Sequence, residues 1–565
     1  MKSPYLETPM ASAAYFLGAG APKFSDPQLA LLAERSGPLA AWRASCAQGL
    51  AGAAAGVSGA FAVGLREPDG RTFLAVDRFA IHTLCYRVVQ GELRFAARAD
   101  ALADGDTEID PQAIFDYLFF HVIPSPRTIF KGIFRVPPAH YVVFEEGRLT
   151  VAPYWEPAFV EAQNPSLADL KEEFRTLVRA AVASQLDGSK PASFLSGGTD
   201  SSTVAGMVGE VCGQAASTYS IGFDASGYDE MEYARIAARR FRTDHHEYYV
   251  TPDDLVRAIG KVATHYDQPF GNSSALPAYY CAAMAKADGV SKILAGDGGD
   301  ELFGGNTRYA KQRVFGWYGH LPQPLREQVV EPVLNQSGLG RLPLVRKAAS
   351  YVEQASVPLP DRLNMYNLLT RLGMDALFTP AFLAQVDVQA PILQQRQVWG
   401  PPGEASALNA NLAFDWRYTL AENDLPKVCG TTQLAGIGVG FPLLDANLLD
   451  FSLRLPTAYK LKGLHLRWFF KEALRGFLPD EIIRKQKHGF GLPFGIWALQ
   501  HSGLKHLAVD ALQSLGQRGF VRQDFIDTLL ERHLPEHPNY YGEMVWILMV
   551  LEQWLRQHAP NYRLA

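Results

Sequence analysis

The sequence has 565 residues, of which 48% are hydrophobic and 20% charged, and its formal net charge is −5. This ordinary globular composition excludes a disordered, collagen-like or coiled-coil protein, and the slight acidity gives no reason to expect nucleic acid or an anionic membrane surface as the main partner. At roughly 150 residues per domain, the length predicts two or three compact domains. Five cysteines without a CxxC pair or zinc spacing indicate a reducing compartment without disulfides.

The stretch 46–65 is the one segment that resembles a membrane span, because all twenty of its residues are uncharged. It consists mostly of Ala and Gly, and its hydrophobicity is too low for insertion. The first residues, Met1-Lys-Ser-Pro-Tyr-Leu-Glu7, contain an acid and a proline where a secretory signal needs an apolar core. We therefore expect a cytoplasmic protein without a membrane partner.

The region from about 57 to 155 is predicted to be rich in β-structure. A turn is expected at Pro68-Asp-Gly70, and Glu145-Glu-Gly147 joins two apolar runs like the turn of a hairpin. The predicted strands are 59–65, 72–76, 93–96, 141–144 and 148–151.

After Pro165 the pattern changes to an amphipathic helix over 167–185, followed by repeated units of short buried strand, glycine-rich turn and helix. This alternation is typical of a parallel α/β sheet. From about 310 onward the chain is mostly helical, and Val545-Trp-Ile-Leu-Met-Val-Leu551 indicates a buried helix near the end. With a linker near 156–166, the predicted domains are 1–160 and 165–565.

The first candidate binding segment is Ser196-Gly-Gly-Thr-Asp-Ser-Ser202, which follows the predicted strand Ala192-Ser-Phe-Leu195 and precedes a helix that can begin at Thr203. Two glycines allow a tight turn around an anion, and a helix N-terminus offers free N–H groups. Asp200 would repel a bare phosphate, so its presence indicates a Mg²⁺ between the two. A glycine-rich turn capped by serines is the alternative, but six fixed positions match by chance at only about 10⁻⁷ per start position. The segment resembles the SGGxDS loop of the PP-loop ATP pyrophosphatases, which split ATP to AMP and pyrophosphate.

A second segment of glycines and acids follows another predicted strand. Lys292-Ile-Leu-Ala295 precedes Gly296-Asp-Gly-Gly-Asp-Glu-Leu-Phe-Gly-Gly305, and α/β folds bind ligands at the carboxyl ends of their strands. Alone, this DxxDE pattern also fits a solvated turn. Together with the first loop, it resembles the SG(E/D)GxDE segment of the asparagine synthetase family.

Further segments extend this resemblance over about 57–500. They are Ser220-Ile-Gly-Phe223, Tyr228-Asp-Glu230, Asp244-His-His-Glu247, Phe441-Pro-Leu-Leu-Asp445, Leu478-Pro-Asp-Glu-Ile-Ile483 and Lys487-His-Gly-Phe490. The resemblance implies an α+β N-terminal domain, an Ntn-type β-sandwich, joined to an α/β parallel-sheet PP-loop synthetase domain with a large helical C-terminal part. It also implies ATP and Mg²⁺ as cofactors.

The resemblance assigns binding roles to residues of both loops. Asp200 and Asp300 would hold Mg²⁺ on the pyrophosphate. The pyrophosphate would be cradled by Ser196, Gly197, Gly198, Ser201 and Ser202. The nucleotide pocket would be lined by Leu195, Ile221, Ala295 and Gly296.

Two further residues are predicted to act in the chemistry. Lys487 corresponds to the family lysine that faces the reacting centre, where it would neutralise charge on the α-phosphate and on the oxyanion, so Lys487→Met should lower kcat by about 10²–10³. Asp297 occupies a position near both substrate and pyrophosphate, where a proton-accepting role is expected. Lys485 is interpreted as a solvated charge, and its replacement by Met should change kcat by less than about threefold.

The N-terminal region departs from the glutamine-dependent members of the family. These begin with Met-Cys, whose cysteine is the nucleophile, whereas position 2 here is Lys. The remainder of the domain is recognisable, since Phe73-Leu-Ala-Val-Asp-Arg-Phe-Ala-Ile81 resembles LARDRFGI. We therefore expect a degenerate glutaminase-like scaffold, in which Cys46 and Cys85 are packing residues.

A second departure precedes Pro442. Relatives commonly read LExRxP, and here Gly438 and Gly440 replace the acid and the arginine. In some relatives that acid belongs to the network that activates the amine, so the substrate geometry is expected to differ from that of asparagine formation.

The leading hypothesis is a ligase that adenylates the carboxylate of a small molecule or peptide and transfers it to an amine not made by its own glutaminase site. This amine could be the substrate's own, as in the β-lactam synthetases and lasso-peptide cyclases, which also keep a degenerate glutaminase domain. The alternatives are an ammonia-dependent asparagine synthetase and a catalytically retired structural or regulatory homologue; Asp200 and Asp300, both intact, argue against the latter. A homodimer or an association with biosynthetic partner proteins is compatible with the sequence.

Overall fold

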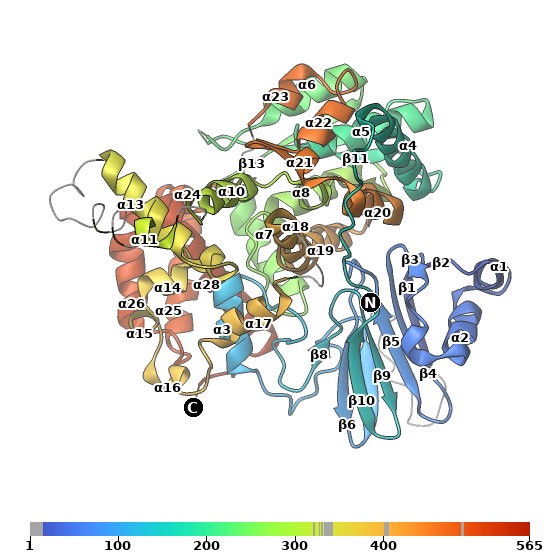
Figure 1. Ribbon diagram of the computed structural model, residues 1–565. Helices are drawn as coiled ribbons and strands as arrows, with labels where there is room; N and C mark the ends of the chain where they lie inside the picture. The colour runs from blue at the N-terminus through green and yellow to red at the C-terminus, as the bar shows by residue number, and fades with distance from the viewer. Residues whose placement is uncertain are drawn as a thin grey trace.

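The computed structural model describes residues 15–225, 227–319, 322–326, 328, 332, 343–400, 406–486 and 491–564. Figure 1 shows an antiparallel β-region at the lower right, a lobe around a parallel sheet at the top and a group of helices at the lower left. The two-part architecture predicted from the sequence, antiparallel first and parallel later, is confirmed.

The N-terminal region contains two sheets that pack face to face. One is antiparallel, in the order β1 (Tyr15–Gly20), β4 (Phe61–Arg66), β5 (Thr72–Val76), β9 (His140–Glu145) and β10 (Arg148–Pro153). The other has the order β7 (Glu92–Ala96), β6 (Cys85–Val89) and β8 (Phe134–Arg135). Leu74 of β5 and Tyr86 of β6 belong to the same apolar cluster between the sheets. The β9–β10 hairpin forms at the predicted turn.

The outer face of the larger sheet is covered by two helices that the sequence analysis did not predict. These are α1 (Pro27–Ser36) and α2 (Pro38–Gln48). Because side chains alternate along a strand, Phe73 of β5 points away from Leu74 and packs against Trp42 of α2.

The lobe around the parallel sheet is built on five parallel strands in the order β13 (Asp244–Val250), β12 (Ser217–Phe223), β11 (Ala192–Phe194), β14 (Lys292–Leu294) and β15 (Gly438–Gly440). The chain runs outward from β11 to β13 on one side and from β14 to β15 on the other. The β11–β14 boundary is therefore a topological switch point, where open α/β sheets bind ligands. α4 (Leu167–Gln185) precedes β11, and the helices that connect the strands from β11 to β14 are α5 (Thr199–Cys212), α6 (Met231–Phe241), α7 (Pro252–His265) and α8 (Ala275–Ala287).

The C-terminal helices share a core with part of the N-terminal region. The predicted buried helix is present as α28 (Pro538–His558), in which the carbonyl of Ile547 accepts a hydrogen bond of 2.8 Å from the hydroxyl of Tyr117 in α3 (Pro111–Phe120). In Figure 1, α3 accordingly lies among the C-terminal helices and away from the β-sandwich. The major helices here are α10 (Thr307–Gly319), α13 (Pro343–Ser356), α17 (Ala390–Val398), α18 (Ala407–Asp415), the π-helix η4 (Trp416–Asp424), α19 (Leu425–Ala435), α20 (Ala446–Arg454), α24 (Phe494–Gln500) and α25 (Ser502–Gly516).

Short elements complete the fold. They are β2 (Lys23–Phe24), η1 (Leu50–Gly52), β3 (Val57–Ser58), α9 (Gly299–Phe303), α11 (Gln323–Leu325), η3 (Asp361–Asn364), α14 (Leu368–Leu372), α15 (Met374–Leu377), α16 (Pro380–Leu383), η5 (Pro442–Leu444), α21 (Thr457–Lys460), β16 (Leu461–Lys462), β17 (His465–Leu466), α22 (Trp468–Ala473), α23 (Asp480–Arg484), α26 (Gln523–Thr528), η6 (Leu529–His533) and α27 (Leu534–Glu536).

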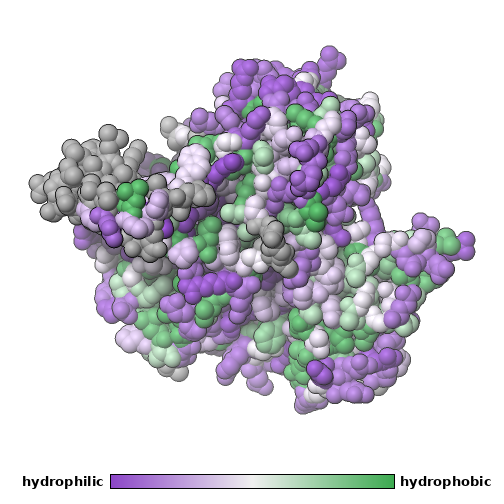
Figure 2. Space-filling model, in the orientation of Figure 1, coloured by the Kyte–Doolittle hydropathy of each residue, from purple (hydrophilic) through white to green (hydrophobic). Residues whose placement is uncertain are grey.

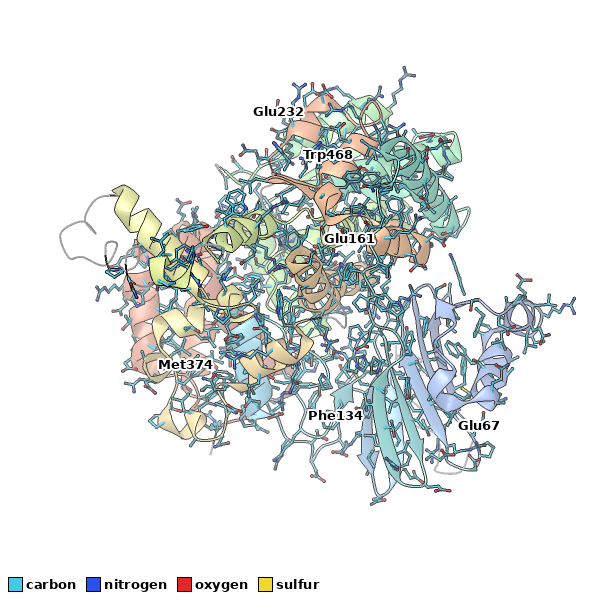
Figure 3. The ribbon with its side chains drawn as sticks, viewed as in Figure 1. Glu67, Phe134, Glu161, Glu232, Met374 and Trp468 are labelled. Carbon is cyan, nitrogen blue, oxygen red and sulfur yellow. The ribbon has the colours of Figure 1, made fainter. Side chains whose placement is uncertain are left out.

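The linker between the two regions is attached to the C-terminal part of the molecule. Glu161 accepts hydrogen bonds from the backbone N–H of Thr457 (3.1 Å) and from the amide of Asn409 (3.0 Å), and it lies near the centre of the molecule in Figure 3. In Figure 2, hydrophilic side chains cover much of the upper lobe. Within the described parts of the chain, none of the helices has the length and apolar character needed to cross a bilayer.

Candidate active site

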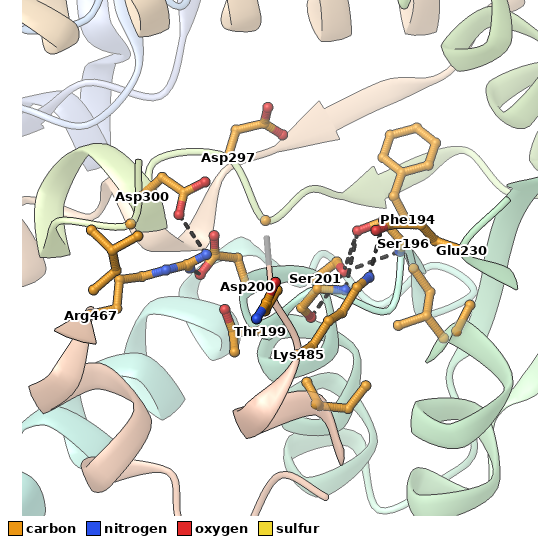
Figure 4. Close-up of a pocket in the computed structure, with 18 of the residues that line it drawn as sticks. Phe194, Ser196, Thr199, Asp200, Ser201, Glu230, Asp297, Asp300, Arg467 and Lys485 are labelled. Atoms are coloured by element: carbon orange, nitrogen blue, oxygen red, sulfur yellow. Dashed lines mark hydrogen bonds and ion pairs between the residues drawn. The ribbon is translucent and has the colours of Figure 1, made fainter. Parts of the chain in front are cut away.

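The loops that follow β11 and β14 open into one cavity of about 1010 Å³ at the carboxyl edge of the parallel sheet. Its wall includes the apolar side chains of Phe194, Ile221 and Met231. Asp200, Asp300 and Arg467 lie together at one end, and Phe194, Glu230 and Lys485 lie toward the other (Figure 4). A cavity that combines apolar wall residues with clustered charges suits a nucleotide, whose base and phosphates differ in the same way.

The first loop leads directly into α5, which begins at Thr199 and therefore four residues earlier than predicted. Its N-cap, Gly198, has no side-chain hydrogen bond, so the first N–H groups of the helix are available to an anion. Gly197 has a φ of +70°, and a Cβ there would overlap the backbone of Ala234. Only glycine therefore allows this tight turn against α6.

Asp200 and Asp300 come from different loops and converge on one cation, the guanidinium of Arg467. Arg467 Nη2 lies 2.5 Å from Asp300 Oδ1, and Nη1 bonds to Asp200 Oδ1 (Figure 4). The approach requires glycines, because a Cβ at Gly299 would overlap the Asp200 carboxylate and one at Gly305 would overlap that of Asp300. Arg467 is only 8% exposed, so the three charges form a largely buried cluster.

This cluster meets the chemical requirements of a Mg²⁺ site shared with a phosphate ligand. Among the residues that the structure describes, no group of three or more His, Cys, Asp or Glu could hold a metal ion. Mg²⁺ is commonly held by one or two protein carboxylates and takes its remaining ligands from phosphate and water. Two carboxylates that already neutralise a cation at the start of α5 fit that pattern.

Asp297 lies in the cavity wall beside a second ion pair. Lys427 Nζ donates to Asp424 Oδ1 at 2.9 Å, and both residues line the cavity. Burial raises the pKa of Asp297 to about 6, and the charge of Lys427 opposes this shift. Burial also disfavours the charge on Lys427, but Asp424 and Asp297 outweigh it and hold the lysine pKa above its usual value. At neutral pH Asp297 is therefore mainly ionised, with a pKa suited to accepting a proton.

The interpretation of Lys485 as a solvated charge is wrong. Its side chain is only 7% exposed, with Nζ 3.0 Å from Glu230 Oε2 and 3.4 Å from the carbonyl oxygen of Gly197. The ammonium also lies 4.5 Å from the ring centroid of Tyr233. Burial lowers the pKa of Lys485, and Glu230 opposes this shift. Lys485 therefore links the first loop, at Gly197, to the start of α6, at Glu230.

Most of the predicted site residues come together at the cavity. Those that line it are Leu195, Ser196, Gly198, Asp200, Ser201, Ile221, Gly296, Asp297 and Asp300. Gly197, Ser202 and Ala295 do not form part of this wall. Ser202 is fully buried on the core side of α5, and Ala295 donates its N–H to Gly440 in the sheet, so both support the loops from behind. Lys487 lies outside the described residues.

The structure adds residues to which the sequence analysis gave no role in the site. Arg467 and the Asp424–Lys427 pair reach the cavity from segments far from either loop. Glu230 belongs to the Tyr228-Asp-Glu230 segment of the resemblance, and Lys485 is two positions before Lys487. For Glu230 the motif itself was the available signal, and for Lys485 it was proximity to one.

Lys485→Met is expected to weaken binding of a MgATP analogue by about tenfold, because the loss of a buried ammonium leaves Glu230 uncompensated and removes the contact to Gly197. Isothermal titration with α,β-methylene-ATP and Mg²⁺ measures this effect. Lys190→Met is the matched control, since Lys190 is exposed, lies before β11 at the opposite end of the strand from the first loop, and donates to the carbonyl of Asp288. Equal affinities for the two variants would contradict the assignment.

Comparisons with known proteins agree with this geometry. A family model described as asparagine synthase matches residues 173–556, more than half of the chain, and one described as a glutamine amidotransferase domain matches 43–155. The chain belongs to the asparagine synthase family. It is 24% identical over 496 residues to a protein named asparagine synthetase [glutamine-hydrolyzing] 1 of Bacillus subtilis, covering 86% of this chain and 75% of that protein. It is 25% identical over 522 residues to a putative asparagine synthetase of Mycobacterium tuberculosis (88% and 76%), and 24% identical over 525 residues to the amidase chyE of Penicillium rubens (82% and 76%).

As a member of this family, the protein is an enzyme, a carbon–nitrogen ligase that forms an amide bond with the energy of ATP. The resemblance recognised from the sequence motifs is thereby confirmed. The two matched ranges correspond to the antiparallel N-terminal region and to the synthetase lobe with its helices.

Proposed function

We propose that this ligase adenylates the carboxylate of a small molecule or peptide, releases pyrophosphate, and transfers the acyl group to an amine that its N-terminal domain does not generate. The observation that carries the proposal is the convergence of Asp200 and Asp300, from two separate strand ends, on one cationic position at the start of α5. Such a site holds the β- and γ-phosphates as a leaving group.

The proposed reaction has two steps. The substrate carboxylate attacks the α-phosphorus of ATP, an acyl–oxygen–phosphorus bond forms, and the bond to pyrophosphate breaks. An amine nitrogen then attacks the acyl carbon, and AMP leaves with the carbon–oxygen bond electrons. Asp200 and Asp300 would hold a Mg²⁺, which when bound would stabilise the negative charge of the departing pyrophosphate.

Different residues of the chain would bind the pyrophosphate, accept the proton and neutralise the developing charge. The N–H groups at the start of α5 and Arg467 would bind and orient the pyrophosphate oxygens. The proton released by the attacking amine would pass to Asp297, whose pKa of about 6 leaves it ionised at neutral pH. Lys487 keeps its proposed role of neutralising the α-phosphate and the oxyanion.

The source of the amine is proposed to be the substrate itself, as in β-lactam or macrolactam formation. In support, the segment that carries an acid and an arginine in many relatives is the edge strand β15, in which Gly438 and Gly440 place no side chain in the cavity. In addition, relatives of this chain include proteins named amidases as well as asparagine synthetases. Free ammonia with aspartate is the second candidate pair of substrates.

Glutamine is expected not to be hydrolysed. Burial raises the pKa of the Cys46 thiol to about 12 and that of Cys85 still further, so neither cysteine of the N-terminal region is a thiolate at neutral pH. Glutamate release from glutamine, followed with purified protein in the presence and absence of MgATP, is expected to stay at the level of a blank. Release at a rate that matches amide formation would contradict this prediction.

The function is tested by the nucleotide product and by isotope exchange. Labelled pyrophosphate should enter ATP only with Mg²⁺ and a carboxylate substrate, and turnover should yield AMP, never ADP. Aspartate with ammonium chloride tests the ammonia-dependent alternative, and compounds or peptides that hold a carboxylate and an amine in one molecule test the intramolecular reaction. ADP as product would refute the proposal, and a protein that does not bind nucleotide would instead be a retired homologue. We further propose that the enzyme works in the cytoplasm.

A further inference from the structure

The π-helix η4 (Trp416–Asp424) connects the cavity to the N-terminal domain. It lies between α18 and α19 and ends at Asp424 in the cavity wall. π-helical segments are rare and are frequent at functional sites. A segment of this kind needs tertiary contacts to hold it, and here several come from the N-terminal domain, including the hydrogen bond from Arg417 Nη2 to the carbonyl of Ser125 and the stacking of Tyr418 on Phe120. Two others reach the ends of the segment.

The first contact is made by Trp416, which is 5% exposed. Its ring packs against Phe79 and Trp155 of the N-terminal domain and against Phe159 of the linker, with ring centroids 5.5–6.5 Å apart. Its indole Nε1 donates a hydrogen bond of 2.9 Å to the carbonyl of Glu301, the residue after Asp300. One side chain thus connects the N-terminal domain to the second nucleotide loop.

The second contact is made by Glu422, which is 3% exposed. Its carboxylate accepts hydrogen bonds from Arg135 Nη2 at 2.7 Å and from Ser125 Oγ at 2.6 Å, both in the N-terminal domain. Arg417, from η4 itself, lies 3.1 Å away. A buried carboxylate must keep its charge partners and hydrogen bonds around it, so these contacts attach Glu422 firmly to the N-terminal domain.

These two contacts fix the ends of the π-helix, and residues of the cavity lie close in sequence to each of them. Asp424 is two residues after Glu422 and pairs with Lys427, whose charge acts on Asp297. Glu301, held by Trp416, is next to Asp300. Asp424 and Asp300, which belong to different segments of the cavity wall, are therefore both positioned through η4.

We propose that the N-terminal domain is retained as a positioning element of the synthetase site, which acts through Trp416 and Glu422 on η4. Arg135, Ser125 and Glu422 are positioning residues that touch no substrate. This role requires no glutamine chemistry and goes beyond the proposed function, since it concerns how the cavity is held in shape.

Hydrogen–deuterium exchange of the full-length protein tests the proposal. Arg135→Met is expected to speed exchange in residues 416–428 by about tenfold, with no change in α25, which contacts neither end of η4. Trp416→Phe keeps the ring but removes the indole donor, and is expected to speed exchange at 299–303. Arg135→Lys, which keeps a cation near Glu422, should restore part of the protection.

The control is Arg87→Met, since Arg87 lies in the neighbouring strand β6 and, among the described residues, donates to Leu102, Asp104 and Thr107 of its own domain. The same exchange pattern in Arg135→Met and Arg87→Met would overturn the proposal. Should Arg135→Met unfold, Ser125→Ala, which deletes one hydrogen bond, replaces it with the same expected pattern. Affinity for α,β-methylene-ATP with Mg²⁺ is measured in parallel: if wild-type protein binds no nucleotide, the proposed function fails, and the exchange result still decides this inference.

Discussion

Asp200→Asn is expected to abolish turnover and to leave the fold intact. The substitution removes one of the two carboxylates proposed to hold Mg²⁺, which corresponds to about 4 kcal/mol of transition-state stabilisation, or about 10³-fold in kcat. Folding should survive, because Arg467 keeps Asp300 as its partner. Pyrophosphate–ATP exchange measures the activity, and circular dichroism with thermal melting reports the fold.

The matched control is Asp187→Asn in the same lobe. Asp187 is exposed, and its partner among the described residues is Ser189, from which it accepts two hydrogen bonds. This variant should keep exchange activity within about twofold of wild type. Wild-type exchange in Asp200→Asn would show that the metal ligands lie elsewhere.

Arg467→Met is expected to be the most destabilising change at the site. It removes the guanidinium that lies between two largely buried carboxylates, and removal of one partner from such a cluster costs about 3–5 kcal/mol. Mg²⁺ should then replace the lost positive charge, so that MgCl₂ raises the melting temperature of the variant by more than that of wild type. In wild type the guanidinium already occupies the position between Asp200 and Asp300, and Mg²⁺ without nucleotide should have little effect.

Arg475→Met serves as the control for this experiment. Arg475 also lines the cavity, but its side chain is half exposed and pairs with Glu472. Its removal should change neither the stability nor the response to Mg²⁺ appreciably, because exposed ion pairs contribute only about 0–1 kcal/mol. A similar response to Mg²⁺ in wild type and Arg467→Met would contradict a cation site between the two carboxylates.

The sequence by itself predicted those parts of the molecule whose signals lie in consecutive residues. The helix over 167–185 has the same bounds in the structure, because the Ser166 cap and the apolar periodicity are local. The two glycine-rich loops and the strands that precede them were likewise recognisable, since each motif contains the strand, the turn and the helix start. In contrast, α2 was missed because its alanine-rich sequence over 38–48 shows almost no amphipathic pattern. α1 was also missed, although the Asp26 cap and Pro27 form a local signal for the start of a helix.

Only the tertiary structure could reveal the contacts between residues that lie far apart in the chain. Asp200 and Arg467 are 267 residues apart, and nothing near either residue in sequence marks the other. Lys485 has the same local composition as a surface lysine, and its burial depends on Gly197 and Glu230 packing over it. The same holds for Glu422, whose buried partners come from the N-terminal domain. Burial and charge pairing are properties of the folded neighbourhood, so these residues became candidates only once the fold had placed their partners beside them.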